Sequence, residues 1–140
     1  MPRATVARYS LRMTALTITQ MLQQGLAHHQ AGSTAEAQRL YRQVLVVDPQ
    51  CAEALHLYGI LLDQGGQHAA AIDLLRRAVA ADPKAARFCI SLGAALTGQG
   101  RFDEAAAVLR QALGLSPRHP GIYNNLGNIY IVGNVGAAKT

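Results

Sequence analysis

Residues 52–83, AEALHLYGILLDQGGQHAAAIDLLRRAVAADP, contain the pattern that determines the fold of this chain. Apolar residues from Leu55 to Leu62 recur at three- and four-residue spacing, which is typical of one face of an α-helix. A second periodic run follows Gly66, and Pro83 ends it, because the residue before a proline is disfavoured in the α region. The segment is therefore predicted to form two helices joined by a short turn.

The same pattern returns along the chain with a period of 34 residues. Three series keep this interval: Pro49, Pro83 and Pro117; Gly25, Gly59, Gly93 and Gly127; and Gly32, Gly66, Gly100 and Asn134. The repeats are placed at residues 18–51, 52–85 and 86–119, with a half-repeat at 120–140 whose helix is expected from about Ile122 to Val132. Self-similarity at this period predicts a stack of about three and a half helical units.

The turn of each unit is expected at its glycine, or at Asn134 in the last unit, because both residue types tolerate the left-handed conformation that often ends a helix. Ser33 and Glu36 are expected to form a capping box at the start of the next helix. Asp103 and Glu104 are interpreted as favourable charges at a helix start, since adjacent residues do not share a helix face.

The mid-helix glycines predict close packing between the two helices of a unit. Glycine inside a helix costs about 1 kcal/mol relative to alanine, so a packing reason is expected. The small residues expected to face these glycines are Ala37, Ala71 and Ala105. A larger side chain at either place is expected to force the helices apart.

The residues at these places resemble the tetratricopeptide repeat, whose 34-residue signature is W-x2-L-G-x2-Y, then A-x3-F, then P. The third unit has Cys89, Leu92-Gly93, Leu96, Ala105, Leu109 and Pro117 at the signature positions, and the fourth has Tyr123, Leu126-Gly127 and Tyr130. Residues 54–60 and 70–78 are similar to repeats of bacterial O-linked N-acetylglucosamine transferase-like proteins. The resemblance covers about residues 18–132 and implies an all-α solenoid of antiparallel helix hairpins.

The resemblance also implies a non-catalytic protein-protein interaction module. In this family the first helices line a concave groove, which binds a peptide or a partner helix, and the second helices form the outer wall. The groove candidates are Thr19, Leu22, Gln23, Leu26, Glu53, His56, Leu57, Ile60, Asp63, Arg87, Ile90, Ser91, Ala94, Thr97, Asn124, Asn125 and Asn128.

Two specialised groove types of the family fit this sequence poorly. Relatives that grip a C-terminal carboxylate converge several Lys, Arg and Asn donors on it, and only Arg87 stands at a matching place here. Transferase-like relatives carry a ladder of asparagines along the groove. It survives here only as Asn125, beside Asn124 and Asn128, so binding of a peptide backbone by amides is expected only at the C-terminal end.

The half-repeat is apolar on a side that a terminal helix normally keeps polar. Its apolar residues are Ile122, Tyr123, Leu126, Ile129 and Tyr130. Either this side is buried on the third repeat, or part of it stays exposed and meets a second copy or another partner. The alternative functions are therefore a structural piece that dimerises through this helix, and the detached N-terminal repeats of a glycosyltransferase-like protein.

Composition excludes several other classes of protein. The chain has 140 residues, of which half are apolar, and no apolar run is long enough for a membrane span. The net charge is +5, but Arg3, Arg8 and Arg12 all precede the first acidic residue, Glu36. The chain from residue 36 onward is therefore nearly neutral, and no nucleic-acid partner is expected. Residues 1–17 are interpreted as a basic extension or leading helix, with an organellar targeting segment as the alternative.

No catalytic, cofactor or metal site is predicted. Cys51 and Cys89 form no CxxC pair, so neither a disulfide framework nor a zinc site is indicated, and a reducing cytoplasm is the expected location. Cys89 is expected to be buried and inert, and Cys51 exposed. His28 and His29, with His56, are the candidate metal ligands. Adjacent residues on a helix point about 100 degrees apart, so His28 and His29 cannot easily bind one ion. His28 is expected in the core instead.

Overall fold

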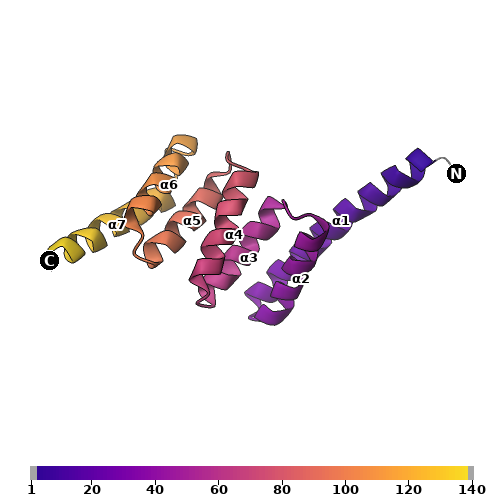
Figure 1. Cartoon of the computed structure of the whole chain (residues 1–140), viewed down its shortest axis with the longest axis horizontal. Helices are drawn as coiled ribbons and strands as arrows, with labels where there is room; N and C mark the ends of the chain where they lie inside the picture. Colours follow the sequence, from indigo (N-terminus) through magenta and orange to yellow (C-terminus); the bar gives the residue numbers. More distant parts are fainter. Residues whose placement is uncertain (1–2, 139–140) are drawn as a thin grey trace.

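The computed structural model describes the backbone of residues 3–138 and the side chains of residues 17–131. Within this part the chain forms seven helices and no strands, which confirms the all-α prediction. The helices are α1 (Arg3–Gln30), α2 (Thr34–Val47), α3 (Ala52–Gln64), α4 (His68–Ala81), α5 (Ala86–Gly98), α6 (Phe102–Leu115) and α7 (Pro120–Ala138). They follow one another along the long axis of the molecule, with α1 and α7 at opposite ends (Figure 1).

Three hairpins, α1–α2, α3–α4 and α5–α6, stack side by side, and α7 packs on the last of them. Within the described backbone, each hairpin contacts only the hairpins beside it. The apolar core is correspondingly a row of clusters between neighbouring helices, with Tyr41, Leu55 and Phe88 fully or almost fully buried in the first of them. This arrangement is the predicted α-solenoid.

Each hairpin turns at a glycine in the left-handed region, as predicted. The φ angles are 84° at Gly32, 86° at Gly66 and 72° at Gly100. The amide of the following residue then returns to the preceding helix; Ser33 N, for example, donates to the carbonyl of His28 at 2.8 Å. This is the Schellman pattern, which satisfies carbonyls that the helix end would otherwise leave without donors.

The predicted capping box is wrong, and the turn explains why. The hydroxyl of Ser33 makes no capping bond. In a capping box, the glutamate accepts a hydrogen bond from the amide of the capping serine. Here the Ser33 amide already donates to the carbonyl of His28. Glu36 instead pairs with Arg39, one turn further along α2, at 3.0 Å.

The mid-helix glycines do allow close packing, but the atoms nearest to them belong to large residues; of the predicted partners, Ala71 is also in contact, with its carbonyl oxygen 3.4 Å from a Cβ atom at Gly59. A Cβ atom at Gly25 would lie 2.6 Å from the ring of Tyr41, and one at Gly93 would lie 2.6 Å from Cγ of Leu109. At Gly59 the nearest atom would be Cγ of Leu75, at 2.8 Å. The residues closest to the glycines are therefore the large ones, one helical turn beyond the expected Ala37, Ala71 and Ala105.

The fourth unit contains no turn at Asn134, which corrects the sequence prediction. α7 runs through this position to Ala138 and begins at Pro120, so it is longer than the expected 122–132. Continuing the helix keeps its backbone hydrogen bonds, whereas a left-handed asparagine costs more than a left-handed glycine. At the other end, the boundary expected between residues 17 and 18 lies inside α1.

Candidate functional site

A depression on the surface between α1 and α3 brings together six of the predicted groove residues. Its volume is about 220 Å³. Thr19, Leu22, Gln23 and Leu26 line it from α1, and Glu53 and Leu57 line it from α3. Both helices are the first of their hairpins, so successive turns of each present a side chain to the same face. The three leucines make the depression mainly aliphatic, and Thr19, Gln23 and Glu53 complete its lining.

Two polar contacts join α3 to α5 beside this depression. Arg87 Nη1 donates to Glu53 Oε2 at 2.7 Å, and the Arg87 guanidinium lies 4.5 Å above the centre of the Phe88 ring. The Nε2 atom of His56 and the hydroxyl of Ser91 are 2.7 Å apart. Arg87, the single cation expected in the groove, is therefore neutralised by Glu53.

His56 was expected to line the groove, but it lies beneath the groove surface. Its side chain is only 7% exposed, its ring is 4.7 Å from that of Phe88, and its Nδ1 atom has no hydrogen-bond partner. Burial lowers the pKa of His56, Arg87 lowers it further, and Glu53 partly opposes both. The imidazole is accordingly a neutral part of the packing between α3 and α5.

The histidines do not assemble into a metal site. His29 Nε2 bonds to Gln64 Oε1 at 2.6 Å, and His28 is half-buried, although it was expected in the core. Among the side chains of residues 17–131, no group of three or more Cys, His, Asp or Glu is placed to hold an ion. Cys89 is buried as predicted, and burial raises the pKa of its thiol, whereas Cys51 is half-buried.

The remaining groove candidates lie outside the depression. Asp63 pairs with His68 at 2.8 Å, and the hydroxyl of Thr97 donates to the Gly93 carbonyl at 2.7 Å, so both side chains are locally engaged. Ile60 and Ile90 are half-buried, and Ala94 is exposed. On α7, Asn124 and Asn128 are exposed and Asn125 is half-buried.

The apolar side of α7 divides between buried and exposed residues. Ile122 is fully buried, so its expected role in self-association is wrong, and Leu126 and Ile129 pack against the third hairpin. Tyr123 is 54% exposed although its hydroxyl donates to the Pro117 carbonyl at 2.6 Å, and Tyr130 is 71% exposed. The apolar side is therefore not entirely buried on the third hairpin, and the contact of its exposed part with a second copy or another partner stays a prediction.

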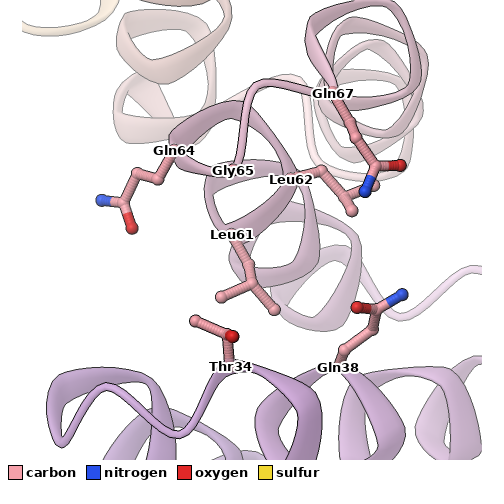
Figure 2. A pocket seen from close by; sticks show the side chains of 7 residues that line it. All are labelled: Thr34, Gln38, Leu61, Leu62, Gln64, Gly65 and Gln67. Atoms are coloured by element: carbon pink, nitrogen blue, oxygen red, sulfur yellow. The ribbon is translucent and has the colours of Figure 1, made fainter.

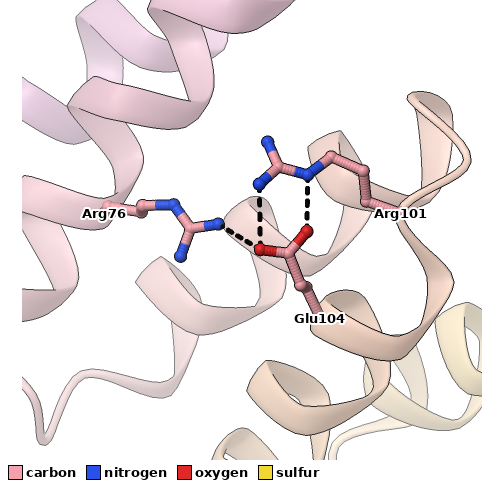
Figure 3. Close-up of polar contacts among 3 residues, drawn as sticks. All are labelled: Arg76, Arg101 and Glu104. Carbon is pink, nitrogen blue, oxygen red and sulfur yellow. Dashed lines mark hydrogen bonds and ion pairs between the residues drawn. The ribbon is translucent and has the colours of Figure 1, made fainter.

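Side-chain hydrogen bonds and ion pairs link successive repeats along the outer wall. Glu104 accepts from Arg76 of the preceding hairpin and from Arg101, both at 2.9 Å (Figure 3). The bonds from Arg101 and then Arg76 lower the pKa of Glu104. Arg42 donates to the Tyr58 hydroxyl at 2.9 Å in the same way, so exposed arginines connect successive repeats.

A second depression, of about 200 Å³, was missed by the sequence analysis. Thr34 and Gln38 at the start of α2 lie opposite Leu61 at the end of α3, with Gln64 and Gln67 near the turn (Figure 2). It combines the start of one helix with the end of another in the next hairpin. Repeat positions alone do not show such a juxtaposition.

The described helices include none that is both long and apolar enough to cross a bilayer. Comparison with curated protein sequences gives no match. Two family models match: one described as Tetratricopeptide repeat, over residues 22–86, and one described as TPR repeat, over residues 93–131.

Two solved structures share the fold of this chain. A mutant O-GlcNAc transferase of Thermobaculum terrenum is 34% identical over 81% of this chain, with a TM-score of 0.76. pilF of Pseudomonas aeruginosa is 27% identical over 86% of this chain, with a TM-score of 0.79. The present chain spans 22% and 55% of those two proteins, respectively.

A third structure, the first TPR of Spaghetti (RPAP3) bound to the HSP90 peptide SRMEEVD, shares the fold. It is 20% identical over 84% of this chain and 93% of its own length, with a TM-score of 0.79. The 34-residue period, the hairpin stack and the two family models agree with one another. The chain belongs to the tetratricopeptide repeat family, with repeats similar to those of the O-GlcNAc transferase.

Proposed function

We propose that the chain is a non-catalytic protein-interaction module that binds a peptide or partner helix through the depression between α1 and α3. The observation that carries the proposal is that Leu22, Leu26 and Leu57 line one depression together with polar residues. Leu26 is 38% exposed, so an incoming aliphatic side chain would remove apolar surface from water on both sides of the contact. Burying one such side chain contributes about 1.5–3 kcal/mol.

One of the two helices that line the depression, α3, is joined to its other neighbour, α5, by polar contacts before any ligand binds. The Glu53–Arg87 pair and the His56–Ser91 bond fix α3 relative to α5. A rigid binding surface loses less conformational freedom on association, which favours affinity. A few such contacts support micromolar binding, which corresponds to about 8 kcal/mol.

The charges of the first helices favour an apolar ligand over an acidic one. Among the described side chains of α1, α3, α5 and α7, the charged residues are Glu53, Asp63 and Arg87. Arg87 is already paired with Glu53. The peptide bound to Spaghetti is acidic, and such a sequence needs converging cations that this groove lacks. Nucleic acid is excluded from the proposal for the same reason.

The proposal places the protein in the cytoplasm. Cys51 and Cys89 are both free thiols, which suits a reducing compartment. The module needs no cofactor, because its work is recognition by shape and apolar contact.

Selection of peptides from a random phage-displayed library tests the proposal. We expect the selected peptides to share an aliphatic residue and to lose about tenfold or more in affinity for a Leu26→Asp variant, because a carboxylate would be buried beside it. Val46→Asp is the matched control, since Val46 is an equally aliphatic but more exposed residue on α2. Equal binding to both variants, or a library that yields no peptides, would contradict the proposal.

A further inference from the structure

α7 carries an uncovered notch that is filled in every preceding repeat. At Gly25, Gly59 and Gly93, a large side chain of the second helix lies within 3 Å of where a Cβ atom would stand. At Gly127, the equivalent residue, no atom lies within 4 Å of that point. The glycine at this position thus has the shape needed to receive a side chain, but the second helix that would supply one is missing from the described structure.

The residues one turn on either side of Gly127 show the same contrast. Tyr123 occupies the repeat position of Leu55 and Cys89, which are both 0% exposed, yet it is 54% exposed itself. Tyr130 occupies the position of Leu62 and Leu96, which are at most 6% exposed, yet it is 71% exposed. A helix face that is buried in the second and third repeats is therefore open in α7.

A charged group beside this face has also lost its partner. Arg42, Arg76 and Arg110 occupy one repeat position, 34 residues apart, on the three second helices. Arg42 reaches Tyr58 and Arg76 reaches Glu104, each in the following repeat. Arg110 is exposed and makes no hydrogen bond or ion pair with any described side chain.

Two of the three second helices, α2 and α6, show what chemistry fits this vacancy, whereas α4 has Ala70 in place of the glutamate. Glu104 precedes Ala105, and Leu109 follows four residues later and covers Gly93. α2 repeats the order, with Glu36, Ala37 and then Tyr41 over Gly25. A helix docked on α7 as α6 docks on α5 would place its large residue over Gly127 and its carboxylate near Arg110.

We propose that the end face of the stack, formed by Tyr123, Gly127, Tyr130 and Arg110, docks an amphipathic helix of a separate protein. Its sequence carries an acidic residue, then alanine, then leucine or an aromatic residue four positions after the alanine. The surface lies at the opposite end of the molecule from the α1–α3 depression, so the proposal does not rest on the proposed groove function (Figure 1).

The charges of the chain favour a separate protein over a second copy. α2 and α6, the helices with the required order of residues, are already packed on α1 and α5. Residues 1–35 and 132–140 contain no Asp or Glu, so neither segment supplies the carboxylate for Arg110. A second copy thus offers no unoccupied helix of this pattern.

The probe is a blocked peptide that copies residues 101–115, with a side-chain bridge between its positions 103 and 107. Both positions are exposed in α6, and the bridge offsets the low helicity of short peptides. Fluorescence anisotropy measures binding to the full chain, and amide shifts of the isotope-labelled chain locate it. We expect shifts around Tyr123, Gly127 and Tyr130, and a loss of about tenfold or more in affinity when Leu109 of the peptide is replaced by alanine.

Variants of the chain separate the docking surface from general effects on stability. Gly127→Leu adds a side chain where a Cβ atom meets no neighbour, and is expected to weaken binding about tenfold or more, whereas Gly98→Leu adds the same side chain at another open glycine, at the end of α5, and leaves binding unchanged. Arg110→Glu is expected to weaken binding about threefold and to recover it with a Glu104→Lys peptide.

Three outcomes would overturn the proposal. The wild-type chain does not bind the bridged peptide; the amide shifts centre on Gly93, which means that the peptide displaces α6; or both leucine variants weaken binding equally. Light scattering supplies a fourth test. A dimer that Gly127→Leu converts to monomer would show that a second copy occupies the face, against the separate protein proposed.

Discussion

Glu53 and Arg87 are equivalent residues of successive repeats, and their side chains form an ion pair of 2.7 Å between α3 and α5. The pair follows from the stacking itself. Residues 34 apart lie at the same height on neighbouring first helices, so opposite charges at one repeat position meet across the junction. The groove therefore has one acid and one base at its centre that cancel each other.

Removing this pair is expected to change the stability of the fold only slightly. The Arg87 side chain is 57% exposed and the Glu53 side chain is 35% exposed, so solvent screens their attraction. A double-mutant cycle with Glu53→Gln and Arg87→Gln, measured by urea unfolding, should give a coupling below about 1 kcal/mol. A coupling of several kcal/mol would show that the pair is instead a main stabilising contact of the stack.

Two equivalent glycines are expected to respond oppositely to alanine. Gly93→Ala brings a methyl group within 2.6 Å of Leu109, so the free energy of unfolding should fall by about 1–3 kcal/mol. Gly127→Ala meets no neighbour and should raise it by up to about 1 kcal/mol through helix propensity. Chemical denaturation of the two variants measures both effects. Stabilisation by Gly93→Ala would mean that α5 and α6 separate without cost.

Acid is expected to weaken the fold through His56. Burial, and then Arg87, lower the pKa of this histidine below its ordinary value of 6.5, despite Glu53. As the pH falls below 6.5, the unfolded chain takes up the proton before the folded chain does, so stability declines until the lowered pKa is passed. His56→Gln should remove this part of the decline in urea midpoints measured over that range. An unchanged pH profile in the variant would contradict the assignment.

Glu104 is expected to weaken the fold in acid in the same sense as His56, but at lower pH. Hydrogen bonds from Arg101 and Arg76 lower its pKa below the ordinary value of 4.5. Its contribution is present above pH 4.5 and is lost as the pH falls through the lowered pKa, because the folded state must then accept a proton. Glu104→Gln should therefore differ from the wild type in unfolding midpoint at neutral pH and converge with it in acid. High salt should reduce the difference in unfolding midpoint between the two proteins at neutral pH.

The two cysteines are expected to differ in reactivity. Cys89 is fully buried and burial raises the pKa of its thiol, whereas Cys51 is half-buried at the turn before α3. An aromatic disulfide reagent should therefore titrate one thiol rapidly in the native protein and both in denaturant. Cys51→Ser should abolish the rapid phase, and its persistence would assign that phase to Cys89.

The sequence was sufficient to predict the architecture because the period is redundant. Prolines, mid-helix glycines and turn glycines repeat independently, and the positive φ angles of Gly32, Gly66 and Gly100 confirm the turns. Where only one residue supported a feature, as at Asn134, the expectation was wrong. α7 continues through Asn134 and keeps its helical backbone instead of turning there.

The groove was predicted by position, but its polar contacts were not. Repeat numbering places Leu22, Leu26 and Leu57 on one face, and they do line one depression. It does not show that His56 turns inward to Ser91, since burial depends on how closely α3 and α5 approach. The Glu53–Arg87 pair was readable in principle, because opposite charges stand 34 residues apart.

The stack of hairpins, in which each contacts only its neighbours, has a thermodynamic consequence for the two proposed surfaces. The described backbone provides no direct route from the α1–α2 hairpin to α7 that bypasses the middle of the molecule. A ligand at one end can influence the other only by shifting an equilibrium in every intervening repeat. The simplest expectation is a coupling free energy near zero, so that the chain binds two ligands additively and serves as a passive bridge between them.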